Sequence, residues 1–199
     1  MSDLLCVTNR TLCAEDFLER IEKTAACHPR GILLREKDLS ETAYEKLAAE
    51  VLAICQRHQV PCILHSFPET ALRLHVSAVH LPLPLLRNMT DIQKMAFQAI
   101  GSSCHSLQEA KEAKRLGCTY IIAGHIFATA CKPRLRARGI PFLKEICANT
   151  ALPVYAIGGI NSENAPFVRR AGAKGLCVMS GIMQCKDPAA YLKNMEESR

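Results

Sequence analysis

The sequence has no tryptophan and few other aromatic residues, four tyrosines and six phenylalanines among 199 residues. Its net charge is +6, but the lysines and arginines are scattered and form no basic stripe. Proteins that bind nucleic acids combine clustered basic residues with aromatic side chains on which bases stack. The composition therefore gives nucleic-acid binding little support, and the positive charge better suits a small anionic substrate.

An apolar run of about 20 residues, the length that spans a bilayer, is also missing from the sequence. The first residues, Met1 to Val7, lack the basic start and long apolar region of a signal peptide. We therefore expect no membrane segment and a cytoplasmic location. Because 49% of the residues are hydrophobic and no linker divides the chain, residues 1–199 are expected to form one domain with a sizeable core.

The eleven cysteines include no Cys-x-x-Cys pair. Four of them lie inside apolar patterns, where a free thiol acts as a small hydrophobe: Cys55, Cys62, Cys147 and Cys177. An odd number of cysteines without a signal peptide argues against a disulfide framework. No spacing of histidines and cysteines matches a known zinc site. We therefore predict neither a metal site nor a cofactor.

Short apolar runs alternate with amphipathic stretches along the whole chain. The runs that predict strands are Leu4–Val7, Gly31–Leu34, Cys62–Leu64, Ala78–Leu81, Gln98–Ser102, Tyr120–Ala123, Val154–Ile157 and Gly175–Met179. Helical stretches are Ala14–Cys27, a long one that begins after Ser40, Phe67–Leu74, Leu107–Leu116, Pro141–Cys147, Ser162–Ala171 and Pro188–Met195. The segment Pro84–Ala96 is either a helix or a long loop.

Eight β-runs, each followed by a helical stretch, predict a parallel sheet. Eight repeats in 199 residues favour a compact (β/α)8 TIM barrel. A doubly wound α/β sheet is the alternative, which the count of eight disfavours. A homodimer would be unsurprising for a barrel of this size.

The chemistry of such barrels gathers where the strands end. His125 follows the run Tyr120–Ala123, a position suited to proton transfer near neutral pH. The alternative is a buried, hydrogen-bonded histidine without a chemical role. Gly158 and Gly159 follow the seventh run and Ser180 follows the eighth, in the loops where barrels often bind phosphate. The alternative for these glycines is that they only form tight turns.

Arg35 and Lys37 alternate after the second run, so both can share one face and hold a carboxylate or a phosphate. The alternative is a solvated loop. Glu36 is the only acidic residue that directly follows a predicted strand. Magnesium held against a pyrophosphate normally needs one or two protein carboxylates. The strand ends therefore favour a phosphate-bearing ligand and a histidine-mediated proton shift over displacement of pyrophosphate.

Five motifs together resemble the thiamine phosphate synthase/TenI superfamily over essentially the whole chain: Gly31–Lys37, Gly101–Ser106, Gly124–Lys132, Ala156–Ile160 and Val178–Ile182. The synthases of this superfamily carry Asn-Asp after the third strand and a further Asp after the fourth, which hold magnesium and pyrophosphate. His65-Ser66 and Pro82 stand at these places here. Gly-His followed by Thr-x-Cys-Lys is the pattern of TenI proteins, so the chain is more similar to TenI than to a working synthase.

The resemblance implies a thiazole tautomerase of thiamine biosynthesis, an isomerase that aromatises a carboxythiazole phosphate without a cofactor. It implies His125 as the proton-transfer residue. Together with the strand ends, it predicts substrate and phosphate contacts at Arg35, Lys37, Ser103, Thr129, Lys132, Gly158, Gly159, Met179 and Ser180. Two alternatives stay open: a non-catalytic TenI-type regulator that binds a thiamine precursor, and thiamine phosphate synthase itself. Cys131 and His65 receive no role.

Overall fold

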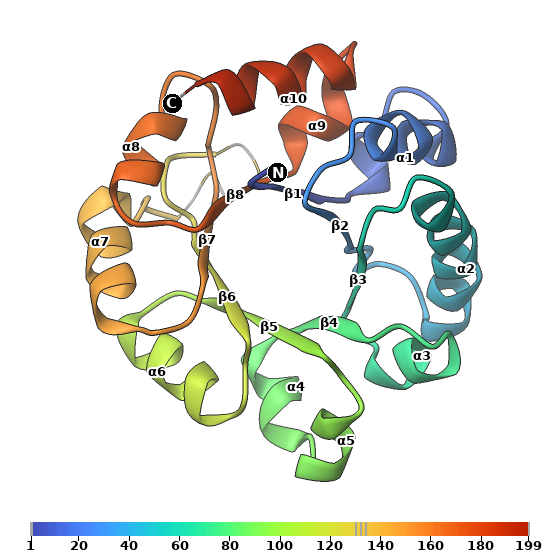
Figure 1. The fold of residues 1–199 in the computed structure, drawn as a ribbon, viewed down its shortest axis with the longest axis horizontal. Helices are drawn as coiled ribbons and strands as arrows, with labels where there is room; N and C mark the ends of the chain where they lie inside the picture. Colours follow the sequence, from blue (N-terminus) through green and yellow to red (C-terminus); the bar gives the residue numbers. More distant parts are fainter. Residues whose placement is uncertain (1, 130, 132, 134, 199) are drawn as a thin grey trace.

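Eight parallel strands form a closed barrel in the computed structural model, which describes residues 2–129, 131, 133 and 135–198. The strands follow one another around the barrel in chain order, and β8 pairs with β1 (Figure 1). Their bounds are β1 Leu4–Val7, β2 Gly31–Leu34, β3 Cys62–His65, β4 Ala78–Leu81, β5 Ala99–Cys104, β6 Tyr120–Gly124, β7 Val154–Ile157 and β8 Gly175–Val178. The predicted TIM barrel is confirmed.

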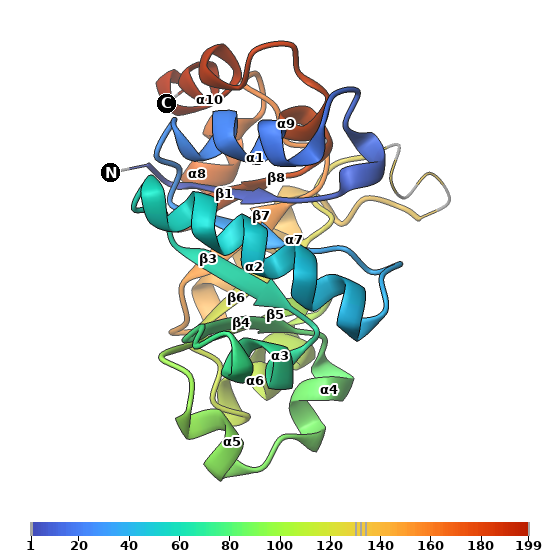
Figure 2. The same ribbon diagram turned by 90° about the vertical axis from the view of Figure 1, so that its right-hand side faces the viewer.

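Helices surround the barrel on its outside, as Figures 1 and 2 show. Those before β5 are the short 3-10 helix η1 Arg10–Leu12, α1 Phe17–Ala25, α2 Glu41–Arg57, α3 Pro68–Arg73, α4 Leu83–Asn88 and α5 Asp91–Met95. Those after β5 are α6 Leu107–Arg115, α7 Gly139–Asn149, α8 Ala165–Arg170, α9 Ser180–Gln184 and α10 Pro188–Glu197. In the described part of the chain, no helix is long and apolar enough to cross a membrane.

The strands are apolar on both faces because both faces are covered. Leu4 and Cys6 of β1 belong to the large cluster between strands and helices, whereas Leu5 and Val7 belong to a smaller cluster of alternate strand residues. That smaller cluster, which also holds Tyr120, fills the barrel interior. This two-sided burial explains why the strands are continuous apolar runs.

The uncertain segment 84–96 contains two short helices. Thr90 separates them, because its side-chain oxygen accepts a hydrogen bond from the Gln93 backbone amide, and the Gln93 side-chain oxygen accepts one from the Thr90 backbone amide. This capping box begins a new helix after the first has ended at Asn88. The predicted N-cap Ser40 also begins α2, with its Oγ accepting from the Ala43 amide at 3.3 Å.

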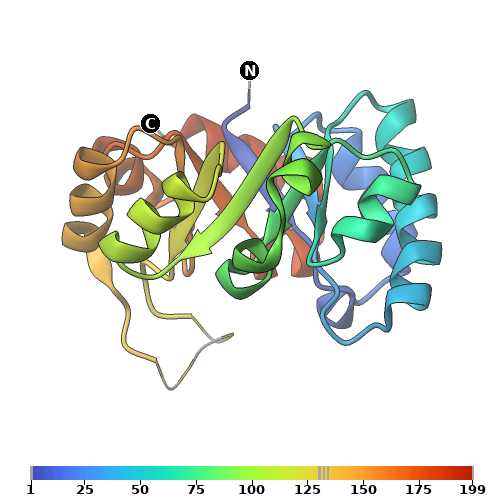
Figure 3. The ribbon, with the colours of Figure 1, turned by 90° about the horizontal axis from the view of Figure 1, so that it is seen from below.

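Three strand ends differ from the prediction in a way that affects the site. β3 continues to His65 and β5 to Cys104, so His65 and Ser103 stand on strands and not in loops. β8 stops at Val178, because Met179 leaves the extended conformation and caps α9. Figure 3 shows the N-terminus at one end of the barrel and the described residues that directly follow β6 at the other.

Candidate active site

A pocket of about 370 Å³ opens where the carboxyl ends of the strands meet. Its walls include nine residues that the sequence singles out: Arg35, Lys37, Ser103, His125, Thr129, Gly158, Gly159, Met179 and Ser180. The structure thus brings residues from β2, β5, β6, β7 and β8 to one place. The remaining predicted contact, Lys132, lies outside the described residues.

His125 lies on the wall of this pocket, and the loop after β6 holds its imidazole. The side chain is 5% exposed, and its Nε2 lies 3.2 Å from the carbonyl oxygen of Leu135. A carbonyl oxygen can only accept, so Nε2 carries the proton and Nδ1 of the neutral ring is the atom that can accept another. The Arg138 amide binds the His125 carbonyl at 3.1 Å, and the Ile126 amide binds the Ile157 carbonyl at 2.9 Å.

Gly158 and Gly159 pack directly against this loop. Gly158 has a φ of +106°, and a Cβ on it would lie 2.3 Å from the Cβ of His125. Gly159 has a φ of +64°, and a Cβ there would lie 2.4 Å from the carbonyl oxygen of Ala128. Both positions require glycine because of the backbone conformation and the close approach of the β6 loop. The pair therefore positions His125, a role that neither sequence-based interpretation included.

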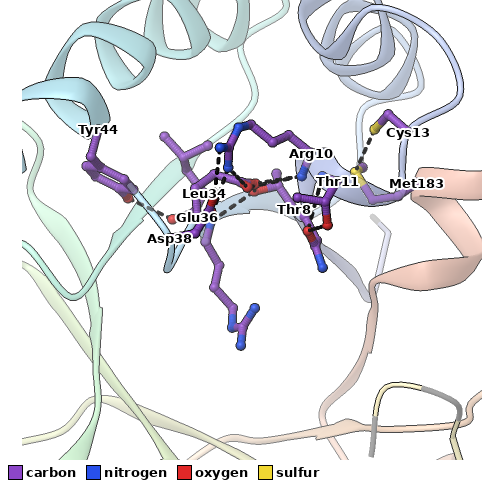
Figure 4. A network of polar contacts seen from close by, with 11 residues as sticks. Thr8, Arg10, Thr11, Cys13, Leu34, Glu36, Asp38, Tyr44 and Met183 are labelled. Atoms are coloured by element: carbon purple, nitrogen blue, oxygen red, sulfur yellow. Dashed lines mark hydrogen bonds and ion pairs between the residues drawn. The ribbon is translucent and has the colours of Figure 1, made fainter. Parts of the chain in front are cut away.

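Glu36 turns away from the pocket into a network with η1 (Figure 4). Its carboxylate is 2% exposed and accepts from the Thr8 hydroxyl at 2.6 Å and from the Arg10 amide at 3.0 Å. The guanidinium of Arg10 also pairs with Asp38 at 2.6 Å. The same Thr8 oxygen accepts from the Arg35 amide at 2.9 Å, so this network fixes the backbone from which Arg35 enters the pocket. Burial lowers the pKa of the Arg35 guanidinium, which stays charged at neutral pH.

Three further histidines line the pocket, and two of them were missed by the sequence reasoning: His80 and His105. His80 lies inside β4, where only the period-2 alternation with the outward Val79 could have shown that it faces the interior. Burial lowers the pKa of His80 to about 3 and that of His65 to about 2. Both imidazoles are therefore neutral and serve as hydrogen-bonding groups. His105 donates from Nδ1 to the Gly124 carbonyl at 2.6 Å.

Carboxylates are scarce on the pocket wall. Of the described lining residues only Glu109 is acidic, and it accepts from the amide of His105 at 2.5 Å. Across the residues the structure describes, no three His, Cys, Asp or Glu side chains gather as metal ligands do. Glu36 is committed to Thr8 and Arg10. The one carboxylate on the described wall, that of Glu109, is thus already bonded to a backbone amide, which fits poorly with magnesium, a cation normally held by one or two protein carboxylates together with the ligand's phosphates.

Residues 4–182 match the family model described as thiamine monophosphate synthase. The chain belongs to the thiamine phosphate synthase/TenI family. It is 34% identical to the thiamine-phosphate synthase of Desulfitobacterium hafniense strain DSM 10664 / DCB-2, over 96% of this chain and 94% of that protein. It is 32% identical to the thiamine-phosphate synthase of Fusobacterium nucleatum, over 95% and 93% of the two chains.

The fold agrees with this membership. The structure of thiamine phosphate pyrophosphorylase from Pyrococcus furiosus superposes with a TM-score of 0.85 at 25% identity, over 98% of this chain and 94% of the other. The chain is thus an enzyme of the thiamine-biosynthetic family. The names of these relatives favour the synthase alternative over the tautomerase. The described pocket wall, however, has His65 and Pro82 where the resemblance implies acidic residues in a synthase.

Proposed function

We propose that this member of the family is a thiazole tautomerase that aromatises a carboxythiazole phosphate by proton transfer through His125. The observation that carries the proposal is the pairing of a buried histidine on the pocket wall with a described lining that is poor in carboxylates. Proton transfer needs a base that is positioned and oriented, and it needs no metal. The Leu135 carbonyl orients this ring with Nδ1 as its basic atom.

The ligand would lie with its phosphate at Gly158, Gly159 and Ser180, which the closed barrel brings together at the ends of β7 and β8. Arg35 would balance a second negative charge from the β2 side. Nδ1 of His125 takes the proton from the ring carbon that bears the carboxylate, the ring double bonds shift, and a proton returns to the exocyclic carbon. Atoms and charge balance, since one C–H bond breaks and another forms. The product is aromatic, so the reaction runs downhill.

The direct test follows the aromatisation of carboxythiazole phosphate by its ultraviolet absorbance. His125→Asn should lower kcat by about 10²-fold or more, the range that a general base contributes. The variant should still bind the aromatic thiazole phosphate, because the phosphate contacts are intact. His75→Asn, the same substitution at a residue outside the pocket wall, should keep wild-type turnover. Near-normal turnover of the His125 variant would remove this residue from the mechanism.

Thiamine phosphate synthase is the second candidate, and the names of the relatives favour it. Incubation with hydroxymethylpyrimidine pyrophosphate, thiazole phosphate and magnesium separates the two activities. We expect no thiamine phosphate, because His65-Ser66 and Pro82 stand where the synthases carry their magnesium-binding acids, and Glu36 does not face the pocket. Clear formation of thiamine phosphate would establish the synthase. Tight binding of carboxythiazole phosphate without conversion would establish the non-catalytic regulator.

A further inference from the structure

A chain of three polar side chains crosses the barrel interior and ends in the pocket. The Tyr120 hydroxyl lies 3.2 Å from Nδ1 of His80, and Nε2 of His80 lies 2.9 Å from the Ser103 hydroxyl. These residues stand on β6, β4 and β5, which are neighbours in the barrel. Gly101 lies between them in register, and a Cβ there would fall 2.1 Å from the Tyr120 ring. The missing side chain at Gly101 thus leaves room for the contact.

The protons in this chain can be ordered in two ways, because a neutral imidazole has one donor and one acceptor nitrogen. In the first order, Tyr120 donates to Nδ1 of His80, Nε2 donates to Ser103, and the Ser103 proton is left for the pocket. In the second, Ser103 donates to Nε2, Nδ1 donates to Tyr120, and the buried Tyr120 proton needs another acceptor.

The second order leaves that proton without a partner. Among the described residues, the Tyr120 hydroxyl makes its one hydrogen bond with His80, and the side chain is 8% exposed. Burying an unpaired hydroxyl donor is unfavourable. Burial also raises the pKa of Tyr120 and lowers that of His80 to about 3. Both groups therefore stay neutral at neutral pH, and the unpaired Tyr120 proton is not lost by ionisation. The first order is therefore favoured, and Ser103 presents a donor to the pocket.

The position of Ser103 suits one end of an anionic ligand. Ser103 is on β5, two strands away from the β7 end that carries Gly158 and Gly159. Two strand spacings amount to about 10 Å, which is comparable to the length of a small ring with a phosphate tail. A ligand whose phosphate binds at β7 and β8 therefore turns its other end toward Ser103. A carboxylate has only acceptor oxygens, so a hydroxyl that donates is matched to it.

We propose that Ser103 binds the ring carboxylate of the substrate and that Tyr120 and His80 are positioning residues that fix its hydroxyl as a donor. This inference rests on the proposed function, and it names two residues, Tyr120 and His80, that act through Ser103. It also predicts a preference for carboxylated over decarboxylated thiazole phosphates.

Calorimetric titration with these two ligands tests the proposal without turnover. Ser103→Ala and Tyr120→Phe should each raise the Kd of carboxythiazole phosphate about tenfold, the expected effect of losing a hydrogen bond to a charged group. The Kd of the decarboxylated thiazole phosphate should not change. The double variant should bind no more weakly than Ser103→Ala, because both changes remove the same interaction. An equal rise in Kd for both ligands would overturn the proposal. So would a double variant whose loss of binding free energy equals the sum of the losses in the two single variants.

Tyr155→Phe is the matched control. Its hydroxyl bonds Nε of Arg30 at 2.6 Å, and its ring packs edge-on against Tyr120 at 5.9 Å between centroids. It therefore loses a tyrosine hydroxyl from the same interior cluster with no contact to His80, and both Kd values should stay at the wild-type level. A carboxylate-specific loss in this variant as large as that of Tyr120→Phe would contradict the relay.

The ring nitrogens of His80 provide a second readout, which can be recorded on the wild-type protein and on Tyr120→Phe. Nitrogen NMR distinguishes a protonated from a bare imidazole nitrogen, and we expect the proton on Nε2 in the wild type and a shift toward Nδ1 in Tyr120→Phe. A proton on Nδ1 of the wild type would overturn the assignment of Ser103 as donor. If this tautomer and the binding preference are found but no aromatisation occurs, the proposed function fails and the recognition of the carboxylate stands.

Discussion

Gly158→Ala should damage the active site through a single methyl group that collides with His125. Its new Cβ would lie 2.3 Å from the Cβ of His125 and 2.8 Å from its Cα. Carbon atoms in contact prefer a separation of about 3.5 Å or more. The two segments must therefore move apart by more than about 1 Å. A displacement of that size at a catalytic group can cost about 10²-fold in rate.

The stability cost of this substitution has two parts. A φ of +106° strains alanine by about 1–2 kcal/mol, and the overlap with His125 adds about 1–3 kcal/mol, as insertion into a packed interior does. Gly117→Ala separates them, because Gly117 has a φ of +93° and its Cβ would have no neighbour nearer than 4.0 Å. Gly117→Ala should therefore lose only the part of the stability that comes from the strained backbone conformation.

The assay pairs urea unfolding with steady-state aromatisation, measured well below the melting temperature of both variants. Gly158→Ala should lose about 2–5 kcal/mol of unfolding free energy and about 10²-fold in kcat. Gly117→Ala should lose about 1–2 kcal/mol and keep its kcat. If the two glycine variants lose equal stability and Gly158→Ala keeps wild-type kcat, then His125 does not depend on this contact.

Two further outcomes follow from the buried polar groups. His65 and His80, whose pKa values fall to about 2 and about 3, bind protons in the unfolded chain first. The contribution of these two histidines to the unfolding free energy should therefore be full above pH ~6.5, and below that pH it should fall by about 1.4 kcal/mol per pH unit for each histidine. Urea unfolding at pH 7 and pH 5 measures this change. An unfolding free energy that does not vary with pH would contradict the burial of these two residues as neutral imidazoles. Glu36→Gln should cost about 1–3 kcal/mol of stability through the weakened bonds to the network and should raise the KM of the phosphorylated substrate. Asp38→Asn, which breaks an exposed ion pair, should cost less stability than Glu36→Gln; equal losses in the two variants would refute the role given to the network.

The barrel itself was predictable from the sequence because its information is local. Most strands are short apolar runs, and several helices begin at a capping residue such as Ser40. The approximate strand ends follow from the same pattern, so the placement of Arg35 and His125 at one opening could be predicted from the sequence. A closed parallel barrel necessarily brings such ends together.

The finer arrangement depended on contacts that no spacing encodes. Glu36 follows a strand like its neighbours, yet Thr8 and Arg10 turn it out of the pocket. His80 was hidden inside an apolar run. The requirement for glycine at position 158 arises from the approach of His125, which is 33 positions away in the sequence and adjacent only after β6 and β7 pair.

The β6 loop is closed at its neck by the bonds from Arg138 and Gly139 to His125 and Ile126. Thr129 and Cys131 lie beyond this neck and face the pocket. His125 and these two lining residues therefore belong to one loop but depend on different parts of it. Under the proposed mechanism, exchanging Thr129 or Cys131 would alter which ring is accepted while His125 keeps its place, so new substrates could be gained here without a change in the proton transfer.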